Sequence, residues 1–137
     1  MKLLRVFMVI AAGVAASGAY AACTPASQVK GANDLRAVLQ GNTICVTRGN
    51  ERWQEYHQAG GALIDYKKGP DHKVDPSKRV GTWSISGNGT GTQLRHEYTS
   101  GAAFSYTVHT ITAGSSYGFC GGGGEMIVTL RAGQGAC

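Results

Sequence analysis

The chain has 137 residues, with 13 lysines and arginines against 8 aspartates and glutamates. This length suits one domain and leaves no room for a second. Two basic residues, Lys2 and Arg5, stand in the first segment, so the remaining chain carries 11 basic and 8 acidic residues, a net charge of +3. So small an excess gives no reason to expect nucleic acid as a partner.

The first segment has the pattern of a signal peptide. Lys2 and Arg5 precede an apolar run over residues 6–16, and Ala19-Tyr20-Ala21 offers small residues where a signal peptidase cleaves. The run is shorter than the roughly 20 apolar residues of a spanning helix, so we expect no transmembrane segment after cleavage. The prediction is a signal peptide over 1–21, or ending at Ala22, and a periplasmic or secreted mature domain over 22–137.

Four cysteines, all in the mature part, predict two disulfides in an exported chain. They are Cys23, Cys45, Cys120 and Cys137. Three pairings are open, and the short loops favour Cys23 with Cys45 and Cys120 with Cys137. Acylation of Cys23 is an alternative, but Tyr20 stands where a lipoprotein signal carries an aliphatic residue. No Cys-x-x-Cys pair is present, so we expect no metal site at the cysteines.

In chain order, residues 33–40 predict one short helix, with Asn33 as its cap and Gly41 at its end. The pattern then alternates with a period of two. It predicts a strand over 43–48, a hairpin from 52–58 and 62–67, a three-stranded meander over 79–112 and a final pair over 117–131. The fold class is therefore mainly β, an antiparallel meander of about seven strands, strongly curved or closed as a barrel.

One group of residues is a candidate for acid–base catalysis. Glu55 and His57 share a strand face, and Asp65 lies across the predicted hairpin, so a carboxylate can orient the imidazole. If Trp53 points into the core, Glu55 and His57 point inward with it. The simpler interpretation, which we favour, places His57 on a solvent-facing strand surface.

Other candidates are dispersed. Candidate binding residues are Trp53, Tyr66, Asp71 and His72, the last two in a loop rich in proline and glycine. His96 shares a face with Tyr98, while Arg95 and Glu97 share the other, where cross-strand salt bridges are the favoured interpretation. Gly121 to Gly124 lacks the Lys-Ser/Thr of a P-loop, so no cofactor is expected.

Several motifs together resemble small exported bacterial proteins of unknown function. They are Leu39-Gln40-Gly41-Asn42-Thr43-Ile44-Cys45, Trp53-Gln54-Glu55-Tyr56-His57, Gly60-Gly61 before Asp65-Tyr66-Lys67, and Gly81-Thr82-Trp83-Ser84-Ile85. The resemblance implies a bacterial source and a small β domain, and it assigns no catalytic residue. Gly81-Thr82-Trp83 also resembles the Gly-x-Trp motif on the first strand of lipocalins and avidins, although only residues 84–137 follow it here.

Two functions remain. The preferred one is an exported, non-enzymatic protein that binds a protein partner or a small ligand on a disulfide-braced β scaffold. The alternative is a small secreted hydrolase, possibly nuclease-like, with His57 or His96 as its general base.

Overall fold

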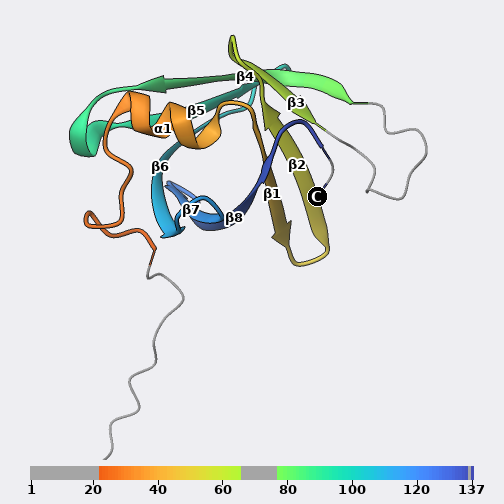
Figure 1. The fold of residues 1–137 in the computed structure, drawn as a ribbon. Coiled ribbons are helices and arrows are strands. Elements are labelled where there is room, and N and C mark those ends of the chain that lie inside the picture. The colour runs from red at the N-terminus through yellow and green to blue at the C-terminus, as the bar shows by residue number, and fades with distance from the viewer. Residues whose placement is uncertain (1–21, 66–76, 136) are drawn as a thin grey trace, which may run out of the picture.

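The computed structural model describes residues 22–65, 77–135 and 137. Within these residues the chain forms one α-helix, eight strands and one 3-10 turn (Figure 1). In chain order they are α1 (Ala32–Leu39), β1 (Asn42–Arg48), β2 (Glu51–His57), β3 (Ala62–Asp65), β4 (Lys78–Ser86), the turn Gly89–Gly91, β5 (Gln93–Tyr98), β6 (Ala103–Thr112), β7 (Ser116–Gly121) and β8 (Gly124–Ala132).

The strands close into one antiparallel barrel. Each strand pairs with the next in sequence, and β8 pairs back onto β1. This confirms the predicted mainly-β barrel with one short helix, with eight strands where about seven were expected. Closure leaves no open sheet edge, which suits a short chain with little else to cover one.

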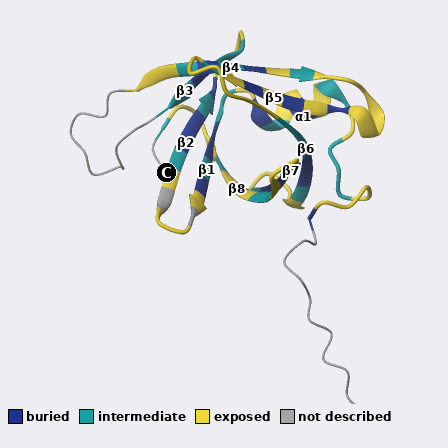
Figure 2. Ribbon diagram, turned by 180° about the vertical axis from the view of Figure 1, so that it is seen from behind, coloured by how far each residue is buried: buried dark blue, intermediate teal, exposed yellow. Residues whose placement is uncertain are grey.

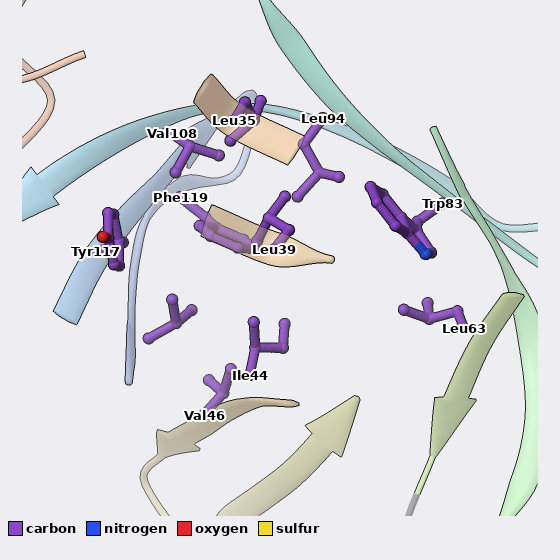
Figure 3. Packing of buried hydrophobic residues seen from close by; sticks show 11 residues of the cluster. Leu35, Leu39, Ile44, Val46, Leu63, Trp83, Leu94, Val108, Tyr117 and Phe119 are labelled. Carbon is purple, nitrogen blue, oxygen red and sulfur yellow. The ribbon is translucent and has the colours of Figure 1, made fainter. Parts of the chain in front are cut away.

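Alternation along the strands sorts side chains between the barrel interior and its outer wall. Ile44 and Val46 on β1 point inward, and so does Phe119, which faces Val108 across β6 and β7. These residues belong to the buried apolar cluster drawn in Figure 3. Residues between them, such as Cys45, point outward.

Helix α1 lies across one opening of the barrel (Figure 1), and the opposite opening is seen in Figure 2. Leu35 and Leu39 project from it into the apolar cluster and are fully buried (Figure 3). The predicted cap was wrong by two residues, because the helix begins at Ala32 and Gly31 takes the cap position. The Gly31 N–H donates to Thr92 Oγ1 at 3.0 Å instead.

The disulfides join each end of the described chain to the outer wall. Cys23 pairs with Cys120, and Cys45 pairs with Cys137. The predicted short-loop pairing was therefore wrong. Cys45 and Cys120 alternate with inward residues, so each points away from the core and meets a terminal segment that lies against the outer wall. With its sulfur in a disulfide, Cys23 has no thiol left for acylation.

No helix in the described ranges is long and apolar enough to cross a membrane.

Candidate functional site

Strand β2 carries the predicted catalytic residues into the barrel. The register places Glu55 opposite Ile44 of β1, and both residues are buried inside the barrel. His57 is two residues further along the same face and is fully buried. The favoured interpretation of a solvent-facing His57 was therefore wrong, because barrel closure places this face of β2 inside.

His57 meets His96 of β5 inside the barrel. Their Nε2 atoms are 3.0 Å apart, which requires one ring to donate and the other to accept. Burial lowers the pKa of both imidazoles below the ordinary range, and His96 lowers that of His57 further. Both rings are consequently neutral at neutral pH, and a proton shared between the two Nε2 atoms holds them together.

Glu55 lies next to this histidine pair. Its Oε1 accepts a 2.8 Å hydrogen bond from the Tyr98 hydroxyl, and its Oε2 lies 3.7 Å from His96 Nδ1. His96 Nδ1 is also 3.4 Å from the Tyr98 hydroxyl oxygen. The network is satisfied best when His57 Nε2–H donates to His96 Nε2 and the His96 Nδ1–H faces Tyr98 and Glu55.

That tautomer leaves one nitrogen without a partner. His57 Nδ1 is buried and makes no hydrogen bond to any described residue. In this tautomer His57 Nδ1 carries no proton, so the unpaired group is a hydrogen-bond acceptor and not a donor. The ring still packs edge-on against Trp83, with centroids 5.2 Å apart.

Burial makes Glu55 a titrating group near neutral pH. Desolvation raises its pKa to about 7, the Tyr98 hydrogen bond opposes the rise, and the negative charge of Asp65 adds to it. Asp65 is the register partner of Glu55 across β2 and β3. The predicted acidic pair therefore does come together, and a carboxyl group with such a pKa can hold or release a proton at neutral pH.

The end of the barrel away from α1 contains a pocket of about 330 Å³. It is lined by Trp53, Glu55, His96, Tyr98, Phe104, Tyr106 and Met126. Phe104, Tyr106 and Met126 also line a neighbouring hollow of about 470 Å³, beside the glycines that connect β7 and β8. Phe104 is half exposed at this mouth, and its ring stacks with Tyr106 at 6.5 Å.

The barrel is thus layered along its axis. The Glu55–Tyr98 contact lies between the histidine pair and the aromatic residues of the pocket, and an apolar cluster together with α1 fills much of the remaining interior. Among the described residues that line the pocket there is neither Lys nor Arg. The arrangement offers a small molecule an aromatic enclosure with one buried carboxyl group at its inner wall.

The outcome for the remaining candidates is mixed. Trp53 lines the pocket, whereas Tyr66, Asp71 and His72 lie outside the described residues. Arg95 and Glu97 do pair, at 2.7 Å, but within strand β5 and on the exposed wall rather than across strands. Sequence reasoning placed His57 and His96 in separate candidate groups, and only their contact across the interior of the closed barrel shows that they meet.

Among the described residues no three His, Cys, Asp or Glu side chains gather as metal ligands.

Comparisons with family models, with curated proteins and with solved structures found no match to this chain.

Proposed function

We propose that the chain is an exported, non-enzymatic protein that binds a small molecule with a cationic or N–H donor group at the open end of its barrel. The observation that carries this proposal is the buried carboxyl group of Glu55 at the inner wall of an aromatic pocket. A ligand would place its apolar body against the rings and its donor on Glu55.

The pocket has the properties of a small-molecule site. Such sites are concave, largely apolar and aromatic, and carry a few polar groups that orient the ligand. The two adjoining hollows, of about 330 and 470 Å³, have the size of such sites and share Phe104, Tyr106 and Met126. Of the seven described residues that line the inner hollow, four are Trp, Tyr or Phe.

The charge of the site favours a donor over an acceptor. Tyr98 occupies Glu55 Oε1, whereas the contact of Oε2 with His96 Nδ1 is 3.7 Å long, beyond hydrogen-bond distance. Aromatic faces beside a carboxylate attract an ammonium group, with a contribution of about 0.5–2 kcal/mol for each well-placed ring. A ligand carboxylate would meet Glu55, and no Lys or Arg stands among the described residues of the pocket to compensate for the two charges.

Export is supported by the disulfides and by the first segment. Both disulfides bridge residues beyond position 21, and such bonds form and persist in oxidising compartments. Residues 1–21 have the charge and apolar pattern of a signal peptide. These two features together support a periplasmic or secreted location.

A hydrolase is the second candidate, supported by the contacts that link Glu55, Tyr98, His96 and His57. However, His96 Nε2 faces His57 and His96 Nδ1 faces Tyr98 and Glu55, so both nitrogens are turned toward protein groups. Glu55 would have to be the acid–base group instead. With bis(p-nitrophenyl) phosphate as probe, the binding proposal predicts no turnover above the buffer rate, and turnover lost in Glu55→Gln would favour the hydrolase.

The binding proposal is tested with three probes of nearly equal size that differ in charge. They are 2-phenylethylamine, 2-phenylethanol and 3-phenylpropionate, titrated by calorimetry into the exported mature protein at pH 8, where Glu55 is ionised. We expect the amine to bind at least about tenfold more tightly than the alcohol, a difference of about 1.4 kcal/mol. The carboxylate should bind weakest.

The matched variants are Glu55→Gln and, as a control on the outer wall, Glu97→Gln. The first should abolish the preference for the amine, and the second should leave it unchanged, because Glu97 is exposed and paired with Arg95. Equal binding of all three probes, or a preference that survives Glu55→Gln, would contradict the proposal.

A further inference from the structure

Glu125, at the start of β8, holds a buried carboxyl group that lacks a partner. Both of its oxygens are inaccessible to solvent, and neither makes a hydrogen bond to a described residue. A buried carboxylate is strongly destabilising unless a cation or several donors compensate for it. A positive group placed beside Glu125 would compensate for the burial of these two oxygens.

Ala22, the first described residue, lies beside this carboxyl group. A Cβ placed on Gly118 would lie 2.9 Å from the Ala22 Cβ and 3.3 Å from Glu125 Oε1. The space above Gly118 is thus bounded by Ala22 on one side and by Glu125 on the other. Ala22 Cβ and Glu125 Oε1 therefore border the same small space, and an amino group at Ala22 would be a near neighbour of it.

The fold itself holds Ala22 in this place. The next residue, Cys23, is joined to Cys120. His109 Nδ1 contacts the Thr24 carbonyl at 2.9 Å, and the Thr110 N–H donates to the Ser27 carbonyl at 2.8 Å. Residues 22–29 therefore form a strap that contacts among the described residues hold against β6 and β7.

We propose that the peptide bond between Ala21 and Ala22 is hydrolysed, and that the new α-ammonium group of Ala22 pairs with Glu125. One water molecule is consumed, the carboxylate stays on Ala21 of the released segment, and the amine of Ala22 takes up a proton at neutral pH. The inference rests on the proposed export of the chain and is independent of ligand binding in the barrel.

The proposal selects one of the two cleavage positions that the sequence allows. Cleavage after Ala22 would start the mature chain at Cys23 and remove the residue that lies against Gly118 and Glu125. Cleavage after Ala21 instead supplies the positive group where the carboxylate is unpaired. Glu125 thus acts as the receptor for the processed N-terminus.

The first test expresses the full chain in a bacterium and measures the intact mass of the protein recovered from the periplasm. The expected mass is that of residues 22–137 with two disulfides. A mature protein that begins at any other residue overturns this inference and leaves the export proposal standing. An unprocessed chain retained in the cytoplasm overturns both.

The second test measures how fast the α-amine reacts with formaldehyde and cyanoborohydride at pH 7. Pairing keeps the amine protonated, and a rise of one unit in its pKa slows the reaction about tenfold. We expect the native protein to react about tenfold more slowly than the same protein in urea, and Glu125→Gln to lose this protection while Glu97→Gln keeps it. Equal rates in the native and the urea-unfolded protein would overturn the pairing, whether or not Glu125→Gln folds.

Discussion

The Tyr98 hydroxyl donates a 2.8 Å hydrogen bond to Glu55 Oε1, and this contact joins strands β2 and β5, which are not neighbours in the barrel. It fixes one oxygen of a carboxyl group that is only 5 % exposed. The same contact raises the pKa of Tyr98, after the larger effect of burial. Tyr98 consequently stays a donor at neutral pH and orients Glu55 within the pocket.

Replacement of Glu55 by Gln should stabilise the protein above neutral pH. The pKa of Glu55 is raised from 4.5 to about 7 in the folded state, so the stability of the wild type falls as pH rises through this interval. Gln does not titrate and still accepts from Tyr98. The difference in unfolding free energy between Glu55→Gln and wild type should grow by about 3 kcal/mol from pH 4.5 to pH 8.

Urea unfolding at pH 4.5, 6 and 8 measures this difference, with Glu97→Gln as the exposed control. Parallel pH profiles for Glu55→Gln and wild type would show that Glu55 ionises normally in the folded protein.

The histidine pair should make the protein sensitive to acid. Both imidazoles have lowered pKa values in the folded state, so below pH 6.5 the unfolded chain binds protons that the folded chain does not. As the pH falls, each histidine then lowers the unfolding free energy by about 1.4 kcal/mol per pH unit. Between pH 7 and 4.5 the protonation of Glu55 in the folded state cancels the effect of one histidine. The net loss in this interval is therefore about 1.4 kcal/mol per pH unit.

His57→Gln isolates one member of the pair, because its amide N–H can still donate to His96 Nε2. We expect its unfolding free energy to fall less steeply than that of the wild type between pH 6 and 4, by about 1.4 kcal/mol per pH unit. Chemical unfolding at four pH values checks the slope. A variant that keeps the wild-type slope would place the proton uptake elsewhere.

Peptide mapping of the oxidised protein should recover Cys23 linked to Cys120 and Cys45 linked to Cys137. Each bond closes a loop of more than 90 residues, so removing the second pair as Cys45→Ala with Cys137→Ala should cost about 3–5 kcal/mol of stability. Denaturant midpoints with and without reductant measure the loss. Recovery of a Cys23–Cys45 peptide would overturn this pairing.

Steric crowding explains why the first position of the Gly-x-Trp motif is glycine. Gly81 faces Tyr98 in the register, and a Cβ at this position would lie 2.1 Å from the Glu97 backbone oxygen. Gly81→Ala must push β4 away from β5, and we expect a loss of about 2 kcal/mol or more. Gly91→Ala is the control, since nothing lies within 4 Å of its Cβ. Similar unfolding midpoints for both variants would contradict the steric account.

The strands were predictable because their turns are short and rich in glycine and their inner faces alternate. Gly87 and Gly101 mark two such turns, and both have the positive φ that favours glycine. The disulfide pairing was not predictable in this way. It depends on which strand walls the terminal segments lie against, and nothing local to Cys23 or Cys137 encodes that placement.

The site was predictable only within one hairpin. The alternation of β2 and the turn after it are enough to place Glu55, His57 and Asp65 near one another. His96 and Tyr98 come from β5, which meets β2 only across the interior of the closed barrel. Contacts of this kind depend on how the barrel closes. Local periodicity indicates a closed barrel, but it does not say which residues of two distant strands face each other inside it.

The titration of the Glu55 carboxyl group, followed by carbon NMR of the mature protein labelled at glutamate, tests the central claim most directly. The proposed function predicts a midpoint near pH 7 in the free protein, and a clearly lower midpoint when 2-phenylethylamine is saturating, because the bound cation favours the carboxylate. A free-protein midpoint near the ordinary 4.5, or one that the amine leaves unchanged, would contradict it.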